Sequence, residues 1–187
     1  MTTTAYYEKG TDTKIAFVLS CPGKEEEEAK KPAAGQTGKN LEDLLEILYT
    51  TYKMPEFKRG LITISNSWAT IEHKKKTGRS QAKITEIYEK DNLDRLANEL
   101  NQITDFIICC GDKAKAAVDK LQDQKILQQD CQILYVAHLG NQGLNNTIKK
   151  SIHGSTLIKT GDEETQAQNK LERLQVVAKD LIEQIKK

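Results

Sequence analysis

The sequence has no apolar stretch long enough to cross a membrane, because no window holds about 18 consecutive apolar residues. Residues 1–10 also lack the basic start and the following apolar run of a secretory signal. Both absences predict a protein that has no membrane partner and that stays in the cytoplasm.

Cysteines at metal-binding spacing are also absent. The four cysteines form no C-x-x-C motif, and no histidine stands at zinc-finger spacing from any of them. Cys109, Cys110 and Cys131 lie in apolar, strand-like runs, where a cysteine usually behaves as a small buried hydrophobe. We therefore expect no metal site and no cofactor.

A strong excess of charge of one sign is missing as well. The formal net charge is +1, so nonspecific attraction to nucleic acid should be modest. Positive charge is local instead, in Lys30-Lys31, in residues 73–76 with Arg79, and in Lys149-Lys150. Each cluster alone is typical of a solvated loop, and it gains meaning only if the fold brings several onto one rim.

What the sequence does contain is typical of one α/β domain over residues 1–187, which we expect to be monomeric. Hydrophobic residues make up 37% of its 187 positions, enough for one core, and no repeat or linker divides it. Apolar stripes at residues 41–48, 93–103 and 171–185 predict helices, and Asp112 is a candidate N-cap for another. Four apolar runs predict strands: Lys14–Ser20, Leu61–Ser65, Phe106–Cys110 and Gln132–Ala137.

This alternation predicts a three-layer αβα fold around a central, mainly parallel four-stranded sheet. In such sheets, ligands bind beyond the carboxyl ends of the strands. The predicted ends are residues 20–23, 66–68, 111–112 and 138–140, and three of them lead into long polar loops. Long loops in a compact domain are usually functional or disordered, so we expect the site there.

The first of these loops carries a specific motif. Residues 21–41 read C-P-G-K-E-E-E-E-A-K-K-P-A-A-G-Q-T-G-K-N-L. This resembles the first signature of the uracil-DNA glycosylase superfamily in its thermophile-type, iron–sulfur branch, G-E-A-P-G-x-x-E-D-x-x-G-x-P-F-V-G-x-A-G-x-L-L. Glu27 stands at the family's Asp, and the ungapped matches are Pro22, Gly23, Glu26, Pro32, Gly35, Gly38 and Leu41.

Three more stretches resemble family motifs in the family's order. Residues 62–66 resemble the strand that ends in the base-reading Asn, and residues 106–111 resemble the apolar strand that ends in Gly. Residues 138–145 resemble the last loop, written H-P-S or N-P-S-G-L-N in different branches. The resemblance covers about residues 14 to 150, and it implies a uracil-DNA-glycosylase-like fold.

The resemblance also implies an activity, the hydrolysis of the bond between a base and its sugar after the nucleotide flips out of the DNA. Asn66 would read a pyrimidine edge with a donor and an acceptor, and His138 would donate to the oxygen of the departing base. Glu26 or Glu27 would hold the water or stabilise the cation-like sugar. Since the motif places no lysine for a Schiff base, the enzyme would be monofunctional.

The resemblance assigns the remaining site residues by position. Base-pocket residues would be Ser20, Cys21, Pro22, Gly23, Ala33 and Asn66. Contacts to DNA would come from Gly38, Lys39, Gly140, Asn141 and Gln142, the last three filling the gap left by the flipped nucleotide. Arg79, from the local positive cluster, is a further candidate for a DNA contact.

The chain departs from the family at three places. Ser20 and Cys21 stand at the positions of the catalytic carboxylate, and the cysteines that bind the iron–sulfur cluster are absent, so we expect no cluster. Ala33 replaces the phenylalanine that stacks on the base, which would leave room for a larger one. We therefore expect a bulky modified pyrimidine, such as a hypermodified cytosine of viral DNA, and a role in defence against phage.

Two alternatives stay open: a uracil-DNA repair glycosylase, and a non-catalytic module that binds a modified base in DNA. A nucleotide cofactor is not expected, because the P-loop pattern G-x-x-x-x-G-K-[ST] fails at Ala33 and Asn40.

Overall fold

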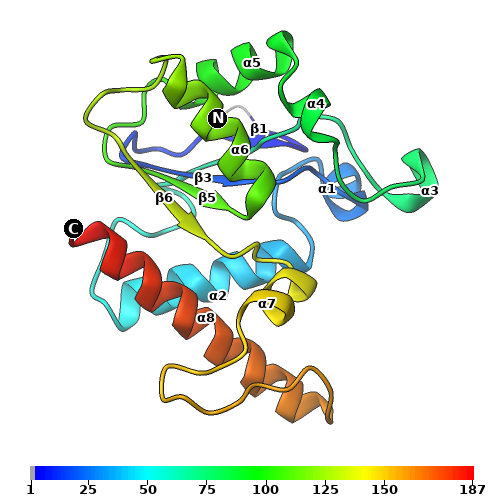
Figure 1. Cartoon of the computed structure of the whole chain (residues 1–187), viewed down its shortest axis with the longest axis vertical. Helices are drawn as coiled ribbons and strands as arrows, with labels where there is room; N and C mark the ends of the chain where they lie inside the picture. Colours follow the sequence, from blue (N-terminus) through cyan, green and yellow to red (C-terminus); the bar gives the residue numbers. More distant parts are fainter. Residues whose placement is uncertain (1–2) are drawn as a thin grey trace.

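A computed structural model describes residues 3–187 as an α/β fold built on one mixed six-stranded sheet (Figure 1). The sheet order is β1-β2-β4-β3-β5-β6. β3 pairs in parallel with β4 and β5, and β5 pairs in parallel with β6. The strands are β1 (Thr3–Thr4), β2 (Tyr7–Glu8), β3 (Ile15–Leu19), β4 (Thr63–Asn66), β5 (Phe106–Cys110) and β6 (Gln132–Val136).

The prediction of a mainly parallel four-stranded sheet is therefore wrong, although its four runs do form adjacent parallel strands. β2 pairs antiparallel with β4, through Tyr7 opposite Ser65, and β1 pairs antiparallel with β2. Both added strands have only two residues, which is too short for a recognisable alternation of apolar and polar residues. They extend the sheet beyond β4.

Helices cover both faces of the sheet (Figure 1). One face carries α2 and α8, and the other carries α5 and α6. Within β3, Ile15, Phe17 and Leu19 join the first core, whereas Ala16 and Val18 join the second. The helices are α1 (Lys24–Ala29), α2 (Gln36–Thr50), α3 (Lys74–Thr77), α4 (Ile84–Ile87), α5 (Lys90–Leu100), α6 (Asp112–Asp123), α7 (Asn141–Thr147) and α8 (Glu163–Ile185).

The predicted helical stripes lie in helices, with two corrections at helix ends. Asp112 is the first residue of α6 rather than its cap, because Gly111 occupies the N-cap position with a φ of 90° that favours glycine. α5 ends at Leu100, so Ile103 is buried in the following turn instead of in the helix. None of the helices in residues 3–187 is long and apolar enough to cross a membrane.

The last part of the chain is held to α8 by a buried arginine. Arg173 is only 2% exposed, and its guanidinium donates to the carbonyl oxygens of Ile148, Leu157 and Ile158. A buried guanidinium needs acceptors for its N–H groups, and the three carbonyl oxygens supply them. The same bonds hold residues 148–158 against α8.

Gly38 tests how tightly α2 packs on the preceding loop. A Cβ at Gly38 would lie 1.8 Å from the carbonyl oxygen of Ala33. Because that oxygen belongs to the backbone, the loop or the helix would have to shift to make room. We expect Gly38→Ala to lower the free energy of unfolding by about 1–3 kcal/mol, despite the better helix propensity of alanine. Gly60→Ala is the control, since its Cβ would meet nothing within 4 Å, and it should change stability by less than about 0.5 kcal/mol. Equal urea midpoints for the two variants would contradict the tight contact.

Candidate functional site

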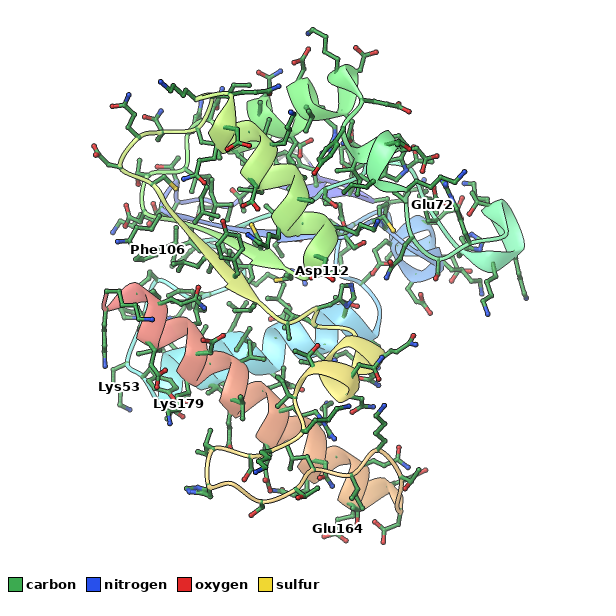
Figure 2. The ribbon with its side chains drawn as sticks, viewed as in Figure 1. Lys53, Glu72, Phe106, Asp112, Glu164 and Lys179 are labelled. Atoms are coloured by element: carbon green, nitrogen blue, oxygen red, sulfur yellow. The ribbon has the colours of Figure 1, made fainter. Side chains whose placement is uncertain are left out.

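The carboxyl ends of the parallel strands open onto a cleft. In Figure 2, Phe106 marks the start of β5 and Asp112 lies just past its end, on the side of Glu72. A cavity of about 470 Å³ and a second of about 520 Å³ share Ser20, Ser80, Gln81 and His138 and so form one cleft. Each volume lies in the range of about 300–1,000 Å³ that is usual for small-molecule sites.

His138 follows β6 and lies in a setting of three glycines. A Cβ at Gly111 would come within 2.9 Å of the His138 Cβ, and one at Gly140 within 2.9 Å of its Cε1. A Cβ at Gly143 would come within 2.5 Å of the His138 carbonyl oxygen. A larger residue would clash with the ring of His138 at position 140 and with its Cβ or carbonyl group at positions 111 and 143, so the three glycines allow its placement.

A hydrogen bond to the ring of His138 determines its tautomer. Its Nδ1 accepts a hydrogen bond of 2.9 Å from the backbone N–H of Gly140, so a neutral ring carries its proton on Nε2. Burial lowers the pKa of His138, which favours the neutral ring. His138 therefore offers the cleft a neutral N–H donor.

Asn66 ends β4 and lines the same cavity as His138. It is 1% exposed, and its Nδ2 donates to the carbonyl oxygen of Tyr6 at 3.1 Å. That carbonyl accepts only from the nitrogen, so the amide orientation is fixed. Within residues 3–187, no hydrogen bond occupies the Asn66 Oδ1, which is left as an acceptor for a ligand.

Glu26 organises the loop between β3 and α2. Its carboxylate accepts from the backbone N–H groups of Gly23 at 2.8 Å, Ala34 at 2.9 Å and Gly35 at 3.2 Å. These bonds occupy both oxygens and join the turn after β3 to the start of α2. Glu26 lines the cavity, and its three backbone bonds hold the loop in place, while its role in catalysis stays a prediction.

The other predicted carboxylate, Glu27, lies outside the residues that line the cleft. It pairs with His73 at 3.0 Å and with Lys76, and hydrogen bonds from Lys76 and then from His73 lower its pKa. Glu25, which sequence analysis did not select, lines the cavity instead. In the described chain Glu25 makes no ion pair, so it is a free carboxylate of the first cavity, and Asp112 in the wall of the second cavity is another.

The predicted base-pocket residues of the first loop divide into two groups. Ser20, Cys21, Gly23 and Ala33 line the cavity, whereas Pro22 lies behind it and accepts from the Glu72 N–H through its carbonyl oxygen. Burial raises the pKa of the Cys21 thiol, so no negative charge stands at the family's carboxylate position.

Ala33 is buried with a φ of 49°, in the left-handed region. Arg59 fixes this backbone, because it donates to the carbonyl oxygens of Pro32 and Ala33 while it pairs with Glu8 and Glu42. No sequence motif marked Arg59, because its partners lie far away along the chain.

The predicted DNA contacts are scattered over the cleft and beyond it. Gly140 and Gln142 line the second cavity, and Asn141 lines a third cavity beside it. Gly38 is buried against Ala33, and neither Gly38 nor the exposed Lys39 lines the cleft.

The structure commits Arg79 to two carboxylates. Its guanidinium pairs with Glu72, which is 2% exposed, and with Glu86 at 2.7 Å. The hydrogen bond from Arg79 lowers the pKa of Glu72 to about 2. Arg79 thus fastens the loop that borders the cleft, and its predicted contact with a phosphate stays a prediction.

Sequence analysis also missed Asn40. This fully buried side chain in α2 donates to the carbonyl oxygen of Leu139 at 2.6 Å and to the Oδ1 of Asn141 at 3.0 Å. It therefore ties α2 to the loop that carries His138. The only signal is a polar residue next to the apolar stripe of α2.

Comparisons with known proteins give no independent assignment. No protein-family model matches the chain, and a search of curated proteins finds no significant match.

NMR of the histidine ring nitrogens tests the state of His138. We expect the Nε2–H tautomer at pH 7 and a pKa below the ordinary value of about 6.5. Because the unfolded chain binds this proton more readily, stability is full above about pH 6.5 and falls as the pH drops below it. His73→Gln and His153→Gln would assign the signals, and an Nδ1–H tautomer at pH 7 would contradict this account.

Proposed function

We propose that this protein is a monofunctional DNA glycosylase with a fold of the uracil-DNA glycosylase type. The observation that carries the proposal is the pairing of two fixed groups in one cleft, the neutral N–H donor of His138 and the free acceptor of Asn66. A flipped pyrimidine presents complementary atoms, a ring or exocyclic N–H and a carbonyl oxygen.

The departing base is stabilised without proton transfer from an acid. As the C1′–N bond breaks, its electron pair stays on the base, and negative charge grows on the pyrimidine oxygen. The Nε2–H of His138 donates to that oxygen, and a preset donor of this kind contributes about 2.7–4 kcal/mol to catalysis. The Gly140 N–H keeps Nδ1 unprotonated, so the neutral ring carries its proton on Nε2.

Water attacks C1′ of the sugar while Glu25 serves as the base. One water proton passes to the Glu25 carboxylate, the other stays in the new hydroxyl, and the released base anion takes a proton from solvent. Glu25 suits this step because it lines the cavity and is not held in an ion pair in residues 3–187. Glu26 supports the step indirectly by holding the loop.

The substrate we propose is a bulky modified pyrimidine, such as a hypermodified cytosine of viral DNA, which would give the protein a role in defence against phage. Three small residues, Ser20, Cys21 and Ala33, line the wall of the cavity, and the signature that the chain resembles has Glu at the position of Ser20 and Phe at that of Ala33. The second cavity adjoins the first through Ser20 and His138, so a substituent on the base has room to extend into it.

A second candidate is a module that binds a modified base in DNA without cutting it. The neutral Cys21 thiol and the full engagement of Glu26 favour it, because neither residue supplies a free negative charge. The two candidates differ in one requirement, since only the enzyme needs Glu25.

Incubation with a panel of DNAs tests the proposal. The panel contains uracil DNA, plain DNA, and phage DNA with hydroxymethylated or glucosylated cytosine, and abasic sites are revealed by an abasic endonuclease. We expect cleavage of one modified DNA only, and a loss of about 100- to 1,000-fold in rate for His138→Ala. His153→Ala is the control, because His153 is exposed and lies outside the cleft.

A matched pair of variants separates the enzyme from the binding module. Glu25→Gln should lose excision while it keeps DNA binding, whereas Glu28→Gln, an exposed residue that does not line the cleft, should keep both. Cleavage of uracil DNA alone would favour a repair enzyme. Binding to one modified DNA with no abasic sites would reject the enzyme in favour of the binding module.

Ala33→Phe tests the preference for a bulky base. A phenyl ring would occupy the space that the substituent on the base needs. The rate of excision of the bulky base should therefore fall at least roughly tenfold. Because Ala33 has a positive φ, Ala33→Asn is a second variant that tolerates this backbone while it narrows the cavity less. Unchanged excision by folded Ala33→Phe, as judged by its urea midpoint, would disprove the role of Ala33.

A further inference from the structure

A third, smaller cavity of about 190 Å³ lies beside the cleft, among α7, the N-terminal half of α8 and the start of α2. Figure 1 shows α7 and α8 side by side, joined by the segment 148–162. Lys159, Lys170 and Arg173 line the cavity together with amide side chains, and none of its lining residues in the described chain is acidic. We call this site the basic cavity.

Arg173 places a buried charge in the wall of the basic cavity. Its Nε and Nη2 donate to three carbonyl oxygens, and Nη1 has no protein acceptor within residues 3–187. No carboxylate of the described chain lies within ion-pair distance of this guanidinium. A buried charge that is solvated by carbonyl oxygens alone is costly, and an anion would offset that cost.

Two lysines add to the same field. The Nζ of Lys159 donates to the Oδ1 of Asn146 at 2.7 Å, and that of Lys149 to the carbonyl oxygen of Asn145 at 2.6 Å. Burial, and then the charges of Lys159 and Arg173, lower the pKa of Lys149. Among the cations of the basic cavity, Lys170 has a carboxylate partner, Asp43 at 3.0 Å.

The position of the basic cavity indicates which anion it binds. Asn141 lines it, while the adjacent Gly140 and Gln142 line the cleft that contains His138. A DNA strand with its base in the cleft would therefore pass over the start of α7 into the basic cavity. The amide of Asn145 in the wall can donate to phosphate oxygens, as amides commonly do at DNA backbones.

We propose that the basic cavity binds a backbone phosphate of the DNA strand that carries the target base, with Lys159 and Arg173 as its main contacts. This inference rests on the proposed function, and it adds a strand-positioning site outside the base cleft. Lys149 strengthens the site through its charge.

The test compares two double variants with equal loss of charge. Lys149→Gln with Lys159→Gln removes the two nearby lysines that have no carboxylate partner in the described chain. Lys179→Gln with Lys186→Gln removes exposed lysines near the other end of α8, far from Glu164 (Figure 2). Arg173 is left intact because its bonds hold residues 148–158. The affinity for a fluorescent duplex is measured over a range of KCl concentrations.

The site variant should bind at least roughly tenfold more weakly than the control variant, as the loss of a charge-assisted bond implies. The slope of log affinity against log salt should also become shallower by about one. Equal affinity and slope in the two double variants would overturn the proposal. A second outcome would also overturn it: inorganic phosphate raises the unfolding temperature of the wild type, but the two double variants bind DNA equally. That result would indicate an adventitious ion only.

The two proposals fail separately. Abasic sites report excision, whereas the salt dependence reports the phosphate contact. If the site variant alone shows the shallower slope and no DNA is excised, the basic cavity stands as a DNA phosphate site and the glycosylase is rejected.

Discussion

The cleft depends on one buried carboxylate that serves the backbone. Glu26 accepts three N–H groups from both ends of the loop that follows β3, and charge-assisted bonds of this kind are worth about 1.5–3 kcal/mol each. They orient the turn at Gly23 and the first residues of α2, which together form one wall of the cavity. A carboxylate engaged in this way is a poor base for water, which is why the proposed mechanism assigns that step to Glu25.

The chemistry of the proposed site comes mainly from neutral groups held in place by the backbone. The tautomer of His138 follows from the Gly140 N–H, and the orientation of Asn66 follows from the Tyr6 carbonyl. Such dipoles are already oriented before a ligand arrives, so they need little reorganisation during a reaction. Cys21 adds no charge, which leaves Glu25 as the carboxylate of the first cavity that has neither an ion pair nor backbone partners in the described chain.

The features that could be predicted from the sequence are those that leave a local pattern in it. Continuous apolar runs indicated the four parallel strands, and the motif register selected Ala33, Asn66 and His138, which line one cavity. Sequence analysis could not find partners that meet only in three dimensions, such as Arg59 with the Pro32 carbonyl. For the same reason Arg79 was read as a free cation, although folding pairs it with Glu72 and Glu86. The two-residue strands β1 and β2 were too short to give a period.

The bond between Asn40 and the Leu139 carbonyl joins residues 99 positions apart. β3 is likewise central in the sheet, with its two neighbours contributed by much later segments. Contacts of such long range form slowly, because a large loop has to close before they give any stability. During synthesis on the ribosome, α2 therefore emerges long before the loop that completes its environment. The buried amide of Asn40 lacks its acceptor until β6 has joined the sheet, so the nascent chain gains its binding cleft only near the end of folding.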